Sequence, residues 1–258
     1  MQVKDKIIVV TGGASGIGRE LASRFTKEGA ARVVIADLNE DGLNAVAADI
    51  GALAKVTDVA QEEGVRDLVR FAEDQAGPID LFCSNAGIAV YGDLDNSNQE
   101  WQRVWDVNLM SHVYAARAVV PIMIERGGGY LLNTASAAGL LSQIGSSTYS
   151  VTKHAAVGFA EWLSITYGDR GIKVSLLCPQ AVRTAMTANL DNGGVAGVDG
   201  MMETEELAEA VIQTLAEERF LCLPHFQVLE YMQRKTGDYD RWLKGMRRLH
   251  AHYGSVAD

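Results

Sequence analysis

Short runs of β-branched and aliphatic residues alternate along the chain with longer segments that have the residue spacing of helices. The apolar runs lie at 7–10, 33–36, 79–82, 130–133 and 172–177, and the helical patterns at 17–28, 60–75, 99–125 and 150–167. Strands that are apolar throughout are buried on both faces, which is typical of a parallel sheet between two layers of helices. The alternation therefore predicts a doubly wound α/β fold.

The composition fits one globular unit and argues against several kinds of partner. Of the 258 residues, 48% are hydrophobic and the formal net charge is −10, so a nucleic-acid backbone would be repelled. The apolar stretch 109–124 is interrupted by Arg117 and Pro121, so we expect no membrane contact. The N-terminal apolar run is too short for a signal peptide. Three unpaired cysteines and scattered histidines favour a reducing cytoplasm and predict neither a disulfide framework nor a metal site.

No repeat or linker divides the chain, so residues 1–258 are expected to form one domain. The glycine-rich stretch 187–200 lacks periodicity and follows the last apolar run. Ligands bind at this end of such sheets, so we expect a substrate loop at about 183–205, with a plain flexible connector as the alternative.

The C-terminal tail, about 224–258, contains one clear helical pattern. Tyr239, Trp242, Met246, Leu249 and Tyr253 recur at intervals of three and four residues, which predicts one apolar helix face. Packing on the same subunit or on a neighbouring one is the main expectation. Binding to a membrane or an acidic partner, or capping of the substrate pocket, are the alternatives.

A glycine-rich turn joins the first apolar run to the first helical pattern. Glycines in the stretch 11–18 allow a sharp reversal and bring the positive end of the helix to a pyrophosphate. Asp37 ends the second run, 19 residues after Gly18, where a carboxylate can bind the adenosine ribose and repel a 2′-phosphate. Neither Ser15 nor Leu38 is basic, so NAD is preferred over NADP as the predicted cofactor. The alternative for Asp37 is an ordinary turn residue at the end of a strand.

Tyr149 and Lys153 lie four residues apart in a helical pattern and therefore share one helix face. An ammonium near a phenol lowers the pKa of the phenol, which suits a general acid or base. Ser136 follows the run 130–133, where its hydroxyl can orient a substrate oxygen. The alternatives are a tight-packing position for Ser136 and a solvated side chain for Lys153.

With these motifs in this order, the sequence resembles the short-chain dehydrogenase/reductase family, in its single-domain branch with a Rossmann-type fold. The resemblance covers roughly residues 5–186. It rests on the glycine turn 11–18, Asp58-Val59, Asn85-Ala86-Gly87, Asn108, Ser136, Tyr149-x-x-x-Lys153 and the segment from Pro179 to Thr184.

The resemblance implies roles for individual residues. Asn108, Ser136, Tyr149 and Lys153 would be catalytic, with Asn108 holding a water that links Lys153 to solvent; a plain helix bend at Asn108 is the alternative. Cofactor contacts would come from Gly12, Ser15, Gly16, Ile17, Gly18, Asp37, Leu38, Asp58, Val59, Asn85, Gly87, Tyr149, Lys153, Pro179, Val182 and Thr184. Substrate contacts would come from Ser136, Leu140, Ile144, Tyr149 and Gln180.

One departure concerns the substrate side. The family usually has glycine where this chain has Gln180, so substrate shape or cofactor orientation is expected to differ. The expected pocket wall of Ile88, Val90, Tyr91, Leu140, Leu141 and Ile144 is apolar. These features predict an NAD-dependent oxidoreductase that interconverts a hydrophobic or aryl-bearing secondary alcohol and a ketone. The alternatives are a reductase of 3-oxoacyl thioesters and, outside enzymes, a dinucleotide-binding regulatory protein. Family members are often homodimers or homotetramers, and we expect the same here.

Overall fold

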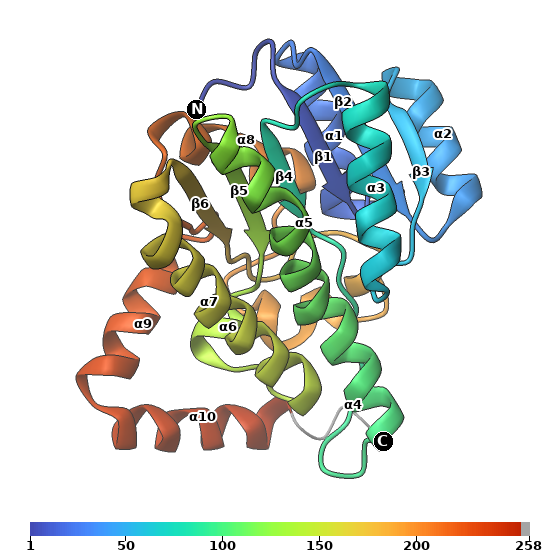
Figure 1. The fold of residues 1–258 in the computed structure, drawn as a ribbon. Coiled ribbons are helices and arrows are strands. Elements are labelled where there is room, and N and C mark those ends of the chain that lie inside the picture. Colours follow the sequence, from blue (N-terminus) through green and yellow to red (C-terminus); the bar gives the residue numbers. More distant parts are fainter. Residues whose placement is uncertain (254–258) are drawn as a thin grey trace.

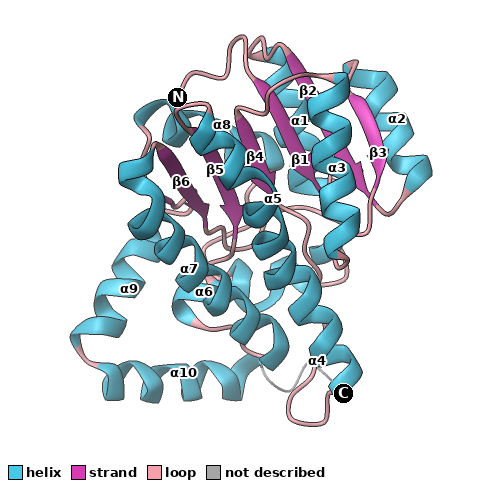
Figure 2. Cartoon of the chain, in the orientation of Figure 1, coloured by secondary structure: helices cyan, strands magenta, loops and turns pink. Residues whose placement is uncertain are grey.

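The computed structural model describes residues 1–253 and places seven of their segments in one parallel sheet, in the order β3-β2-β1-β4-β5-β6-β7. The strands are β1 (Ile7–Thr11), β2 (Arg32–Asp37), β3 (Leu53–Val56), β4 (Leu81–Ser84), β5 (Gly129–Thr134), β6 (Ile172–Leu177) and β7 (Leu221–Cys222). This architecture confirms the predicted doubly wound α/β fold. Figure 2 shows the strands in the interior with helices around them.

Helices cover both faces of the sheet. One layer contains α1 (Gly16–Lys27), α2 (Glu40–Ile50) and α8 (Thr204–Glu217), and the other contains α3 (Glu62–Gln75), α5 (Ser111–Glu125) and α7 (Ser147–Tyr167). Alternate residues of β1 enter opposite cores: Val9 packs with the α3, α5 and α7 layer, whereas Ile8 and Val10 pack with the other. Strands buried in this way need no polar face, which explains their continuous apolar runs.

A continuous helical segment leads to the centre of the fold. It comprises α4 (Asn98–Trp105), a π-helical turn over Asp106–Met110, and α5. By length and composition, residues 98–125 are apolar enough to cross a membrane, but half of the apolar window is buried inside the protein. Val119 and Met123 are fully buried in the main core. This segment is therefore a core helix.

The strand order reverses beside β1, and this reversal locates the site. The chain leaves β3 at the sheet edge and returns to pair β4 with β1, where Val9 lies opposite Phe82. The loops after β1 and β4 diverge to opposite sides, which opens a crevice at the carboxyl ends of the strands. Figure 1 shows these two strands side by side at the middle of the sheet.

Two segments after β6 lie outside the sheet. The expected substrate loop contains short 3₁₀ turns at Ala185–Thr187 and Asp191–Gly197 rather than long regular structure. The tail forms α9 (Gln227–Gly237) and α10 (Tyr239–Tyr253), which extend as the red arm below α6 (Ala138–Leu141) and α7 in Figure 1. The helix predicted from the apolar stripe is confirmed as α10, and Trp242 packs on a small cluster with Leu141 and Val228.

The glycine turn gives a stability test. A Cβ atom added to Gly18 would overlap the carbonyl oxygen of Gly12 and crowd the Asn85 amide. We expect Gly18→Ala to lower the free energy of unfolding by about 1–3 kcal/mol, as overpacking of a rigid site does. Gly237→Ala, where a Cβ meets nothing within 4 Å, is the matched control and should leave it almost unchanged. Urea unfolding of both variants measures the difference, and equal stability would contradict the tight packing at Gly18.

Candidate active site

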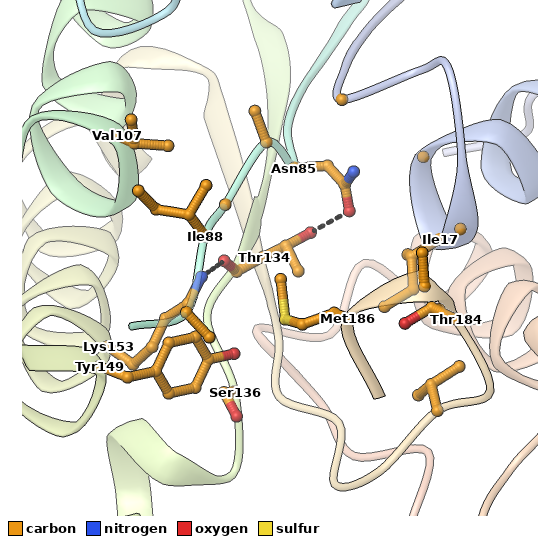
Figure 3. Close-up of a pocket in the computed structure, with 18 of the residues that line it drawn as sticks. Ile17, Asn85, Ile88, Val107, Thr134, Ser136, Tyr149, Lys153, Thr184 and Met186 are labelled. Atoms are coloured by element: carbon orange, nitrogen blue, oxygen red, sulfur yellow. Dashed lines mark hydrogen bonds between the residues drawn. The ribbon is translucent and has the colours of Figure 1, made fainter. Parts of the chain in front are cut away.

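A cavity of about 530 Å³ lies at the carboxyl ends of the strands. Every residue that the resemblance assigned to the cofactor lines this cavity, from Gly12 through Thr184. Tyr149, Ser136 and Lys153 line it as well. In Figure 3 these three lie on one side of the cavity, and Ile17, Thr184 and Met186 lie on the other. The structure therefore brings the glycine turn and the Tyr149 region into one space.

The glycine turn has backbone angles that favour glycine. Gly12 and Gly16 have φ values of 70° and 52°, and a Cβ atom on Gly12 would come within 3.0 Å of the backbone of Ala86. Helix α1 begins at Gly16, and the side chain of Ser15 makes no capping hydrogen bond to it. The first N–H groups of α1 therefore remain available for an anion, which this end of a helix attracts.

Asp37 lies at the cavity edge, where β2 ends. One carboxylate oxygen accepts a hydrogen bond from the N–H of Ala14 at 3.1 Å, and the other accepts one from the N–H of Asn39 at 3.0 Å. The bond to Asn39 is the turn contact of the alternative interpretation, and the bond to Ala14 ties the carboxylate to the glycine turn. Asp37 thus forms a local turn and also presents a fixed negative charge to the cavity.

A chain of hydrogen bonds joins four elements under the cavity. The amide of Asn85 donates to the carbonyl oxygen of Thr11 at 3.0 Å, and the hydroxyl of Thr134 donates to the Asn85 side-chain oxygen at 3.2 Å. The ammonium of Lys153 donates to the carbonyl oxygen of Thr134 at 3.0 Å. Figure 3 marks the last two bonds. Asn85 therefore connects the ends of β1 and β5, and Lys153 is fixed to the same frame.

Tyr149 lies in the first turn of α7, with Lys153 one turn further on the same face. The Lys153 nitrogen is 5.5 Å from the centroid of the Tyr149 ring. We expected the ammonium to lower the pKa of the phenol, but the structure gives the opposite direction. Burial raises the pKa of Tyr149 to about 12, opposed by hydrogen bonding to Ser136. The expected lowering is therefore wrong for the cavity as it stands, because burial outweighs an ammonium that is bonded to Thr134.

Lys153 itself is 2% exposed, so the alternative of a solvated lysine is wrong. Burial lowers the pKa of its ammonium to about 8. A charged amine is costly to bury, and its hydrogen bond to Thr134 offsets only part of that cost.

Ser136 follows β5, as expected, and its hydroxyl is held by the backbone. It donates to the carbonyl oxygen of Pro179 at 3.3 Å and accepts from the N–H of Ala138 at 3.1 Å. Both partners are local or come from the segment after β6. Ser136 therefore has the packing role of the alternative interpretation while its side chain also lines the cavity.

Asn108 lies in the π-helical turn and does not line the cavity directly. Its oxygen accepts from the N–H of Ile88 at 2.9 Å, and its amide donates to the carbonyl oxygen of Ile88 and the hydroxyl of Thr152. A Cβ atom on Gly87 would lie 3.4 Å from both the Asn108 oxygen and the Lys153 nitrogen. Asn108 thus lies where the helix departs from regular winding and also close to Lys153, so the two interpretations are compatible.

The expected substrate wall needs correction. Leu140 and Ile144, with Val90 and Leu141, do not line the cavity, because α6 directs its leucines toward α9. Ile88, Tyr91 and Gln180 do line it. Residues that the sequence reasoning missed include Arg103, Val107, Gln143, Ser146, Met186, Thr187 and Leu190. The position of Met186, Thr187 and Leu190 in the expected substrate loop was the signal that could have identified them.

A family model described as short chain dehydrogenase matches residues 6–194. A 1-deoxy-11-beta-hydroxypentalenate dehydrogenase from Streptomyces exfoliatus is 38% identical over 85% of this chain and 83% of its own length. An uncharacterized oxidoreductase from Staphylococcus aureus (strain MRSA252) is 35% identical over 83% of this chain and 92% of its own length.

Solved structures match nearly the whole chain. A short chain dehydrogenase/reductase from Burkholderia phymatum in complex with NAD superposes with a TM-score of 0.85 at 28% identity, covering 93% of this chain and 96% of its own. A 3-ketoacyl-(acyl-carrier-protein) reductase from Brucella melitensis complexed with NADH gives a TM-score of 0.80 at 28% identity, covering 86% of this chain and 96% of its own.

Burial of Lys153 makes stability depend on pH in a defined direction. Its pKa is about 8 in the folded protein and 10.5 in the unfolded chain, so between these values the unfolded chain binds more protons. The free energy of unfolding should therefore rise with pH in this window. We expect wild type to gain about 2 kcal/mol over Lys153→Met between pH 8 and pH 10. Urea unfolding without cofactor measures this gain, and a pH-independent difference would contradict the lowered pKa.

Proposed function

The chain belongs to the short-chain dehydrogenase/reductase family, and we propose that it uses NAD to interconvert a hydrophobic or aryl-bearing secondary alcohol and a ketone. That it is an oxidoreductase acting on alcohols follows from the family, whose members use NAD(H) or NADP(H). The observation that carries the finer proposal is a single cavity with Asp37 at one end and Tyr149, Lys153 and Ser136 at the other.

The cavity fits a dinucleotide at its glycine end. The glycines of the turn carry no side chains that would occupy the space for a pyrophosphate. The start of α1 offers N–H groups that no side chain caps. Within the described part of the chain, the cationic residues lining the cavity are Arg103 of α4 and Lys153 of α7. Both belong to the helix layer on the side of the sheet opposite α1, whereas the acidic side chain of Asp37 lies at the end of β2. Because this carboxylate would repel a 2′-phosphate, Asp37 supports NAD over NADP. The bound nicotinamide would accept or donate the hydride.

At the chemical end, Tyr149 would hold the proton that moves to or from the substrate oxygen. Its high pKa keeps the phenol protonated at neutral pH, which suits proton donation to a ketone. In the direction of alcohol oxidation the phenol must first lose this proton, and the ammonium of Lys153 is the neighbouring charge that favours the phenolate. Ser136 would orient the substrate oxygen, and Asn108 would hold the water that links Lys153 to solvent.

The apolar side chains around the chemical end support the substrate class. Ile88, Val107, Met186 and Leu190 line the cavity, and Gln180 adds an amide where glycine is usual. The S. exfoliatus relative is named as a dehydrogenase of a hydroxypentalenate, a compound that carries a hydroxyl group, as the proposed alcohol substrate does. A screen of secondary alcohols and ketones with both nicotinamides would identify the substrate.

Reduction of 3-oxoacyl thioesters is the second candidate. A carrier protein would need a basic surface, and α10 offers exposed Arg241, Lys244, Arg247 and Arg248. The B. melitensis neighbour is named as a reductase of that kind. Faster turnover of acetoacetyl-CoA than of any simple ketone in the same screen would favour this candidate.

We also propose a homodimer or homotetramer in the cytoplasm, with the whole chain as one domain. A largely apolar groove between α5 and α7 includes Val120, Phe159 and Trp162, and Trp162 and Ile165 are 51% and 83% exposed. Apolar area of this kind supports association through these two helices. The three cysteines are free and buried, which fits a reducing compartment.

Tyr149→Phe tests the chemistry. Without the hydroxyl no proton can be exchanged with the substrate oxygen, so kcat should fall by about 10²- to 10⁴-fold. The Kd of NAD should stay nearly the same, because the ring remains in place. Tyr239→Phe, at a half-exposed position at the start of α10, is the control and should keep full activity. Loss of turnover in Tyr149→Phe with intact NAD binding would also exclude the regulatory-protein alternative, whereas full activity would refute the assignment of Tyr149.

Asp37→Ala tests the cofactor. Loss of a carboxylate that bonds the ribose and repels a 2′-phosphate should reduce the NAD over NADP ratio of kcat/KM by about 10- to 100-fold. Asp41→Ala in α2 removes an exposed acid close by in the sequence and is the control for a general charge effect. If wild type prefers NADP, or if Asp37→Ala keeps its ratio, then Asp37 does not select the cofactor.

A further inference from the structure

The substrate half of the cavity has two walls that lie outside the sheet. One is the substrate loop, which contributes Met186, Thr187 and Leu190. The other is the segment between β5 and α7, which contributes Ser136, Gln143 and Ser146. Neither wall belongs to a strand of the sheet. Isolated β-bridges pair Val182 with Met202 at the base of the substrate loop and Ser146 with Gly92 in the second wall. Contacts with the tail add to these bridges.

Helix α9 bonds to the first wall through Tyr231. The phenol of Tyr231 donates a hydrogen bond to one carboxylate oxygen of Asp199, at 2.9 Å. The other oxygen of Asp199 accepts from the side-chain amide of Gln180 at 3.0 Å, and Gln180 lines the cavity. Asp199 therefore holds the end of the substrate loop between the tail and the cavity floor. Removal of the Tyr231 hydroxyl would leave Asp199 with only one of these two bonds.

The same helix bonds to the second wall one turn further along. The ammonium of Lys235 donates to the carbonyl oxygen of Leu140 at 2.6 Å, and positions 231 and 235 share one helix face. Apolar packing reinforces this contact, because Val228 is fully buried against Leu141 and Leu140. One face of α9 thus touches both walls of the substrate half.

We propose that α9 is a brace that fixes the distance between the two walls, and that Tyr231 and Lys235 are positioning residues that set which alcohols fit. The brace acts through Asp199 and Leu140, and neither Tyr231 nor Lys235 lines the cavity. This inference rests on the proposed function only where it concerns the alcohol; the mechanical link between α9 and the walls does not depend on it.

Hydrogen–deuterium exchange of the full-length protein tests the link without any substrate. Tyr231→Phe should raise amide exchange in residues 187–200 by about fivefold and leave residues 137–146 nearly unchanged. Lys235→Met should have the reverse effect. Lys244→Met, at an exposed position of α10, is the control for both. If neither variant changes exchange in its own wall more than the control does, the brace is overturned, whatever the enzyme catalyses.

Steady-state kinetics tests positioning against a merely structural role. With cyclohexanol and 1-phenylethanol as probes, each variant should raise the KM of the alcohol by roughly 10-fold, while kcat and the KM of NAD change less than about twofold. Because the walls move apart in each variant, the ratio of kcat/KM between the two alcohols should also come closer to one. Equal losses for alcohol and NAD would overturn the positioning role. Turnover of neither alcohol by wild type, with the exchange pattern intact, would count against the proposed reaction and support the brace.

Discussion

The structure depends on a chain of hydrogen bonds that runs from Thr11 through Asn85 and Thr134 to Lys153. Each bond joins the carboxyl end of one strand, or the first half of α7, to its neighbour. The glycine turn starts at one end of this chain, and the Tyr149 ring lies beside the other. Because all four groups are held by backbone or amide partners, the two halves of the cavity keep one relative position. Cofactor recognition and proton chemistry thus share a single rigid support.

Burial affects the two ionisable groups at the chemical end in opposite ways. It raises the pKa of Tyr149 to about 12 and lowers that of Lys153 to about 8. Each shift favours the neutral form, as expected where water is excluded. At neutral pH the pair therefore consists of a protonated phenol and a protonated amine, and Asp37 provides a carboxylate at the far end of the cavity.

Local sequence patterns were sufficient for the sheet, the glycine turn and the Tyr149–Lys153 face, because each is set by residues within a few positions of one another. Strand β6 has the predicted bounds, and helix α10 spans the apolar stripe from Tyr239 to Tyr253 that predicted it. The pKa of Tyr149 was not predictable in this way, since it depends on burial by segments distant in the sequence. The part of the predicted substrate wall formed by Leu140 and Leu141 was wrong for the same reason. Ser142, with a φ of 82°, ends α6, whose leucines pack with α9 almost 90 residues later. Packing between segments distant in the sequence therefore determines the pKa of Tyr149 and the lining of the cavity, and residue spacing within one segment does not predict either.

The π-helical turn at Asp106–Met110 has a consequence for the whole segment from α4 to α5. Its wider turn carries one residue more than an α-helix would, so the side chains before it are rotated relative to those after it. Arg103, before the turn, lines the cavity, whereas Val119 and Met123, after it, lie in the core. Deleting one residue here would restore regular winding and turn α4 by about 100°. The one additional residue in the π-helical turn thus allows a single helical segment to contribute side chains to the cavity before the turn and to the core after it.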